Sequence, residues 1–68
     1  MRTIGKKNRD LVRKVTLESL QDGNDGIQTL REVPYRLPLS LWDIWESAES
    51  EIIGLITETI LEYQRDNS

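Results

Sequence analysis

The sequence contains no cysteine and no histidine. Without cysteine the chain forms neither a disulfide nor a thiolate metal site, and without histidine it lacks the usual proton shuttle and metal ligand. No apolar run approaches the roughly 20 residues that span a membrane, and residues 1–8 lack the apolar core of a signal peptide. We therefore expect a cytoplasmic protein that has no cofactor, no bound metal and no membrane contact.

Catalytic and phosphate-binding motifs are also missing. No glycine-rich phosphate loop follows a strand, and no serine lies in a nucleophile elbow. Asp43/Glu46 and Glu58/Glu62 have helical spacing, but the Glu-x-x-His partner of di-metal helix sites is absent. A calcium loop counted from Asp22 would have Gly26 at its fifth position and Val33 at its twelfth, where oxygen ligands are needed, so the segment 22–26 predicts a turn. We expect a protein that is not an enzyme.

The longest periodic stretch is 40–63, which predicts one long amphipathic helix. Ser40 and Asp43 have the spacing of a capping box, and Leu39 and Ile44 that of a hydrophobic staple. Apolar residues recur on one stripe with the i, i+3, i+4, i+7 pattern of a buried helical face. The stripe consists of Leu41, Ile44, Trp45, Ala48, Ile52, Leu55, Ile56, Thr59 and Tyr63.

This apolar face is wider than one neighbouring helix covers. Trp42, Ile53 and Ile60 extend it to an arc of about 180°, whereas a surface helix usually shows an arc a little over 100°. With 68 residues, of which 37% are hydrophobic, a monomeric core is marginal. We therefore expect a homodimer or a partner protein to cover this face. The predicted interface consists of Trp42, Trp45, Ile53, Ile56 and Ile60.

The rest of the chain predicts smaller elements around this helix. We expect a flexible basic arm at 1–8, a helix at about 9–21 capped by Asn8, a linker at 22–39 and a frayed tail at 64–68. Within the linker two alternatives stay open. Asp25 caps a short helix that ends at Pro34, or residues 33–37 are extended. The fold class is all-α, a long C-terminal helix packed with a shorter N-terminal one.

Charge is distributed unevenly along the chain. Residues 1–14 hold six basic residues and one acid, which gives a net charge of +5. Residues 15–68 hold three basic residues and eleven acids, which gives a net charge of −8. A basic segment of this kind either binds nucleic acid or pairs with the acidic side of the long helix. The possible nucleic-acid contacts are Lys6, Lys7, Arg9, Arg13, Lys14 and Arg36.

The sequence Tyr35-Arg36-Leu37-Pro38, followed by Leu41-Trp42-Asp43-Ile44-Trp45, resembles the opening of a ribbon-helix-helix DNA-binding domain. The resemblance covers about the last 35 residues. It implies a short strand that pairs with a second chain and reads the major groove through Val33, Tyr35 and Arg36. In that family a loop separates two helices. A break at residues 46–51, as opposed to a continuous helix, therefore distinguishes this alternative.

Three functions follow from these patterns. The favoured one is a protein–protein interaction module, such as an adaptor, inhibitor or assembly factor, that acts through the wide apolar face. The first alternative is a dimeric ribbon-helix-helix regulator or antitoxin. The second is an inhibitor that mimics nucleic acid through acidic residues of the long helix, namely Asp43, Glu46 and Glu58.

Overall fold

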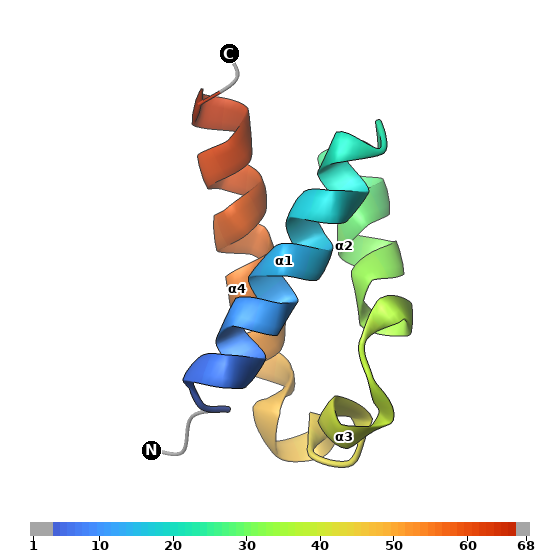
Figure 1. Cartoon of the computed structure of the whole chain (residues 1–68), viewed down its shortest axis with the longest axis vertical. Coiled ribbons are helices and arrows are strands. Elements are labelled where there is room, and N and C mark those ends of the chain that lie inside the picture. Colours follow the sequence, from blue (N-terminus) through green and yellow to red (C-terminus); the bar gives the residue numbers. More distant parts are fainter. Residues whose placement is uncertain (1–3, 67–68) are drawn as a thin grey trace.

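The structure, a computed structural model, describes residues 4–66, and these residues form four helices and no strand (Figure 1). The helices are α1 (Lys6–Gln21), α2 (Gly26–Arg36), α3 (Leu39–Trp42) and α4 (Trp45–Asp66). α1 crosses α4, α2 descends beside α1, and the short α3 turns the chain back into α4 (Figure 1). The predicted all-α fold, with a long C-terminal helix packed on the N-terminal helix, is confirmed.

The core lies between α4 and the two helices α1 and α2. The predicted α4 stripe supplies much of it, with Ile52 and Ile56 wholly buried, and α1 and α2 contribute Val12 and Val33, which are equally buried. Burying such a side chain stabilises the fold by about 1.5–3 kcal/mol. The wide apolar arc therefore has two neighbours from its own chain, which the expectation of a single neighbour did not foresee.

The first helix begins earlier than predicted. α1 starts at Lys6, after Gly5 with a positive φ of 88°, so Asn8 lies inside the helix and does not cap it. The Asn8 side-chain amide donates instead to the Ile4 carbonyl oxygen at 2.9 Å. Ile4 is buried in the core, and this anchor explains why residues 6–8 are helical although a flexible arm was predicted. Residues 1–3, the rest of that arm, lie outside the described residues.

The predicted turn at 22–26 is confirmed, and Gly23 determines its geometry. Gly23 adopts a φ of 100°, a conformation that glycine reaches without a steric penalty. Its N–H donates to the Leu20 carbonyl, and the Asn24 N–H donates to the Ser19 carbonyl. This pair of bonds is a Schellman motif, which satisfies carbonyl groups at the end of α1.

A helix occupies most of the predicted linker. Of the two alternatives for the linker, the helix capped by Asp25 is the one observed. The Asp25 carboxylate accepts a hydrogen bond from the Gln28 N–H at 2.8 Å at the start of α2. The predicted end at Pro34 is wrong, since α2 continues to Arg36 with Pro34 inside it. Proline lacks an N–H donor, and its ring crowds the carbonyl four residues earlier, here that of Leu30. α2 keeps its helical backbone past this point but ends two residues after Pro34. Pro34 is also buried, which adds packing.

The long helix is shorter than predicted at its start. Asp43 and Ile44 form a turn that separates α3 from α4, and α3 begins at Leu39 without a side-chain cap, so the predicted capping box of Ser40 is wrong. The backbone explains the break. The N–H groups of Ser47 and Ala48 both donate to the Ile44 carbonyl, which starts a new helix there. Beyond it α4 is continuous through 46–51.

Two consequences concern the alternatives. The residues that the ribbon-helix-helix resemblance assigned to a strand, Val33, Tyr35 and Arg36, lie in α2, and the helix has no break at 46–51. The part of the chain that the structure describes therefore lacks the ribbon that this family uses to read DNA.

At the C-terminal end, α4 extends to Asp66, so the predicted tail is helical at 64–66, and residues 67–68 lie outside the described residues.

Candidate functional site

Three aromatic residues meet where α2, α3 and α4 come together. The Trp42 and Trp45 rings stack with centroids 4.8 Å apart and planes at 27°, and the Tyr35 ring lies 6.2 Å from Trp42 at 43°. We call Tyr35, Trp42 and Trp45 the aromatic corner. Offset and tilted pairs at these distances are favourable geometries for aromatic rings, so the three rings form one connected surface.

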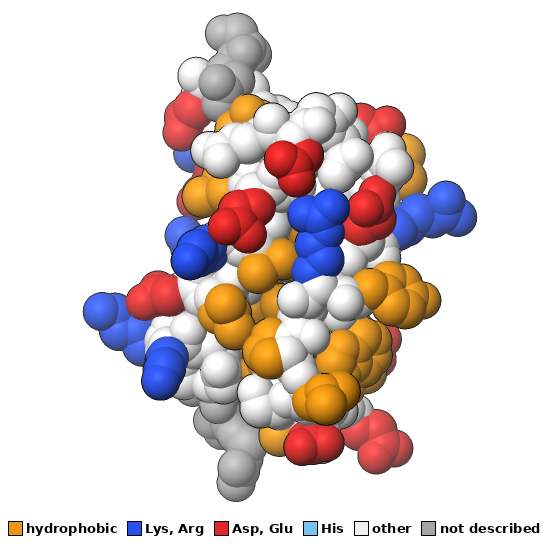
Figure 2. Space-filling model, turned by 45° about the vertical axis from the view of Figure 1, so that its right-hand side comes forward, with side chains coloured by type: hydrophobic (Ala, Val, Ile, Leu, Met, Phe, Trp, Pro, Cys, Tyr) orange, Lys and Arg blue, Asp and Glu red, His pale blue; other side chains and the backbone are white. Residues whose placement is uncertain are grey.

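This surface is open to solvent, although its base is anchored. Trp45 is half-buried and packs against the core, whereas Trp42 is 36% exposed and Tyr35 is 84% exposed. Leu39, one turn before Trp42 in α3, is 80% exposed. In Figure 2 the molecule is turned so that the right-hand side of Figure 1 comes forward. Hydrophobic side chains gather on the lower part of this face. A cluster of solvent-exposed aromatic side chains is typical of a binding site for another protein.

The turn at Asp43 and Ile44 creates the corner. Trp42 ends α3 and Trp45 begins α4, so the two rings stack across the turn and not along one helix. α3 has only four residues, and Leu41 is its one buried side chain among the described residues. A helix this short cannot cover the rings of Tyr35 in α2 and Trp45 in α4.

The edge of the corner is acidic. Asp43 follows Trp42 and Glu46 follows Trp45, both side chains are exposed, and neither forms an ion pair within residues 4–66. Acidic side chains are visible at the lower edge of the apolar area in Figure 2. The corner therefore combines an apolar centre with a rim of negative charge.

The predicted interface residues separate into two groups. Trp42 and Trp45 form the corner, but Ile56 and Ile60 are buried against the chain's own helices, and Ile53 is partly buried on the same core. The methyl groups of Ile60 lie near the start of α2, because a Cβ on Gly26 would stand 3.1 Å from Ile60 Cγ2. Ile56 and Ile60 are therefore core residues of this fold and are not exposed on its surface, which the prediction without helix α2 did not foresee.

The basic residues also separate. Arg9 pairs with Glu51 at 3.5 Å, and Arg13 pairs with Glu58 at 2.9 Å and Glu62 at 3.8 Å, so these arginines join α1 to α4. This pairing with the long helix is one of the two alternatives the charge pattern left open. Arg36 pairs with Asp22 and Glu32. Lys6, Lys7 and Lys14 are exposed on α1 and form no ion pair within the described residues.

The acidic residues of the nucleic-acid mimicry alternative do not form one row. Glu58 is paired with Arg13 on the side of α4 that faces α1, whereas Asp43 lies in the turn before α4. In residues 4–66 no three acidic side chains converge as a metal site would require. In the same range, no helix has the length and the apolar character of a membrane span.

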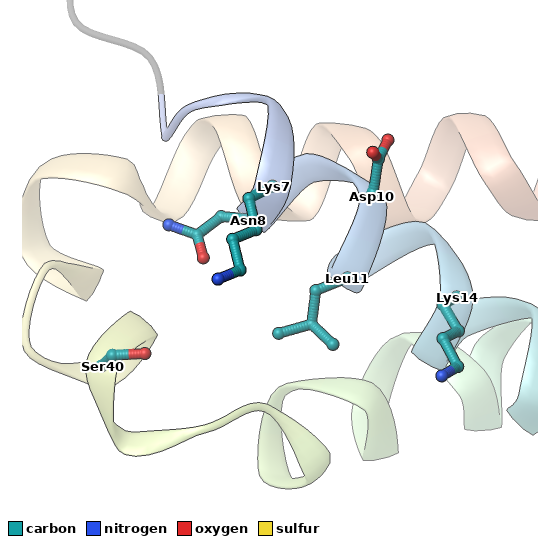
Figure 3. Close-up of a pocket in the computed structure, with 6 residues that line it drawn as sticks. All are labelled: Lys7, Asn8, Asp10, Leu11, Lys14 and Ser40. Atoms are coloured by element: carbon teal, nitrogen blue, oxygen red, sulfur yellow. The ribbon is translucent and has the colours of Figure 1, made fainter.

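A second surface feature is a groove between α1 and α3. It has a volume of about 480 Å³ and is lined by Lys7, Asn8, Asp10, Leu11, Lys14 and Ser40. Figure 3 shows Lys7, Asn8 and Leu11 projecting from α1 toward the space in front of Ser40, while the Asp10 carboxylate points away from it. None of the aromatic corner lines this groove.

No family model, no curated protein and no solved structure matches the chain.

Sequence reasoning found the tryptophan pair but not its neighbours. In the sequence, Tyr35 fits an extended segment of the kind that reads DNA, and Leu39 fits a hydrophobic staple; neither pattern indicates a surface shared with the tryptophans. The place of Tyr35 in the corner, with Leu39 beside it, depends on α2 continuing past Pro34 and on the turn at residues 43–44. The Leu37-Pro38 dipeptide predicts extended backbone after α2, as the structure has it, but it does not indicate that the end of α2 lies near Trp42.

Proposed function

We propose that this protein is a non-enzymatic interaction module that binds a partner protein through the aromatic corner. The observation that carries this proposal is the exposed stack of Tyr35 and Trp42 on a half-buried Trp45. Tryptophan and tyrosine are enriched among the few residues that dominate binding energy, because they bury much apolar area and lose little rotamer freedom.

The charge around the corner supports a partner of complementary character. Asp43 and Glu46 are exposed and unneutralised within the described residues. Two copies of this chain facing each other through the corner would bring these acidic rims together, which is unfavourable. A partner with an apolar centre and a lysine- or arginine-rich rim gains both apolar burial and charge complementarity, so we favour a foreign partner over a homodimer.

Affinity capture with matched variants tests the proposal. Leu39→Asp introduces charge beside the corner, at an exposed position one turn before Trp42, and Leu61→Asp makes the same change at a 60% exposed position of α4. We expect a partner that is retained by the unmodified chain and by Leu61→Asp but is lost with Leu39→Asp and with Trp42→Ala. The captured partner should also bind more weakly when Asp43 and Glu46 are both made neutral.

Light scattering over a concentration series completes the test. A monomer at all concentrations is expected for the isolated chain. A partner retained equally by the unmodified chain, Leu39→Asp and Trp42→Ala would overturn the proposal. A homodimer lost in Leu39→Asp would replace the foreign partner with a second copy.

A further inference from the structure

The groove between α1 and α3 holds cations that the rest of the chain leaves unneutralised. The described residues contain more acids than bases, and Arg9, Arg13 and Arg36 all pair with carboxylates of the chain. Lys7 and Lys14 line the groove and form no such pair within residues 4–66. Asp10 is the third charged residue of the lining, and its carboxylate points away from the groove (Figure 3), so two ammonium groups set the electrostatic character of the groove in an otherwise acidic protein.

The groove also offers an apolar contact and neutral hydrogen-bonding groups. Lys7, Leu11 and Lys14 are spaced i, i+4 and i+7, which places them in one row on α1 with the leucine between the lysines. Leu11 is half-buried and packs against the core, so its position is fixed. The Ser40 hydroxyl reaches toward this row from α3 (Figure 3).

We propose that this groove binds an acidic peptide segment of a partner protein, with two carboxylates about 10 Å apart on either side of an apolar side chain. The spacing is that of the two lysines along α1, seven residues at about 1.5 Å each. Acidic residues at i and i+7 of a helix have the same separation, and a leucine between them reaches Leu11. The site is distinct from the aromatic corner and goes beyond the function proposed above.

A peptide fits this groove better than a nucleic acid does. A duplex carries one negative charge per roughly 1.7 Å of its axis, and binding it depends on neutralising many phosphates. Here the acidic Asp10 is one of the lining residues, and Arg9 and Arg13, which would extend the positive surface of α1, are already paired with acids. The absence of an aromatic ring in the lining also removes the stacking that single strands use.

The test is a titration of isotopically labelled protein with a synthetic helical peptide, followed by amide chemical shifts. The peptide carries glutamates at i and i+7 with leucine between them, and a control peptide has glutamine in place of both glutamates. We expect shift changes at Lys7, Leu11, Lys14 and Ser40 with the first peptide only. Because the ion pairs are exposed, binding should weaken as salt is raised.

Two double variants of equal charge test the site itself. K7Q/K14Q removes the cations of the groove, and K6Q/R31Q removes two exposed cations outside it. Glutamine is a good helix former, so both variants should keep the fold. We expect the dissociation constant to rise about tenfold for K7Q/K14Q and less than about twofold for K6Q/R31Q.

Several results would overturn the proposal. These are equal weakening in both double variants, equal binding of the glutamine peptide, or shift changes confined to other residues. Tighter binding of a DNA duplex at Lys7 and Lys14, with displacement of the peptide, would replace the peptide with a nucleic acid as the ligand.

Discussion

The α1–α4 face and the aromatic corner are both built from large apolar side chains, but they end in opposite environments. On the first, Val12, Ile52 and Ile56 have no exposed surface, and ion pairs from α1 to α4 close its edge. On the second, Tyr35 and Leu39 are mostly in solvent. The difference lies in the length of the helix beside each surface. The 16-residue helix α1 packs along α4, whereas the helix at the corner, α3, has four residues.

Charge follows the same division. The arginines of α1 lie opposite the acids of α4, so the edge of the buried face is neutralised by the chain itself. The acids beside the corner, Asp43 and Glu46, have no such counterpart in the described residues. An apolar surface whose rim is left charged and unpaired is suited to a partner, whereas one whose rim is closed by ion pairs is suited to stability.

The largest difference in stability between the two regions should come from replacing one apolar residue by aspartate in each. Ile56→Asp buries a carboxylate without a partner and should cost more than about 3 kcal/mol, out of a total stability on the order of 5 kcal/mol for this size. Leu39→Asp meets water and should change stability by less than about 0.5 kcal/mol. Urea unfolding followed by circular dichroism measures both. A folded Ile56→Asp variant of normal stability would contradict the division.

The polar contact between α1 and α2 should give the next largest effect. Thr29 is wholly buried, and its hydroxyl lies 3.1 Å from the Ser19 hydroxyl, which also accepts from Asn24. Thr29→Val leaves Ser19 short of a partner and should cost about 1–3 kcal/mol. Thr57→Val is the control, because Thr57 is exposed and bonds only within α4. Equal effects of the two changes on urea unfolding would show that the buried contact is not important.

Two glycine substitutions should shift stability in opposite directions. Gly54 lies inside α4 with nothing within 4 Å of an added Cβ, so Gly54→Ala should stabilise by about 0.5–1 kcal/mol through helix propensity. Gly23 has a φ of 100°, so Gly23→Ala should destabilise by about 1 kcal/mol. Thermal unfolding of both variants checks the pair. A loss of stability in Gly54→Ala would indicate that this side of α4 is covered.

The ion pairs at the edge of the α1–α4 face should contribute least. Arg13 is 38% exposed and Glu58 57% exposed, so Arg13→Gln should cost about 0.5 kcal/mol at low salt and less at high salt. Arg31→Gln, at an exposed residue without an ion pair in residues 4–66, serves as the control. Urea unfolding at two salt concentrations measures the difference. A cost independent of salt would point to packing of the arginine stem instead of its charge.

Periodicity was sufficient to predict the α4 stripe, because i, i+3, i+4 spacing directly reports which side of a helix is buried. It could not locate the turn at Asp43 and Ile44, where the apolar pattern continues although the helix does not. α2 was hidden for a related reason. Pro34 ordinarily ends a helix, but burial of Pro34 and Val33 against the core outweighs one missing hydrogen bond.

The candidate site was predicted in part. The spacing of Trp42 and Trp45 identified a surface of interest. The width of the apolar arc predicts a second molecule, which stays a prediction, but it did not indicate that α2 of the same chain packs on α4 near Ile60. The groove had no sequence signal of its own, since Ser40 and the α1 lysines are separated by more than 25 residues. Only the path of the chain through α2 and α3 brings them together.

The burial of Leu41 has a consequence for how the molecule fluctuates. As the one buried residue of α3 among those described, it holds a segment that borders both the aromatic corner and the groove. Amide hydrogen exchange in α3 should therefore proceed by a local opening that leaves α1 and α4 folded, with a free energy well below that of global unfolding. A ligand that stabilises α3 from either side would slow this exchange, and occupancy of one surface would be felt at the other through the same short helix.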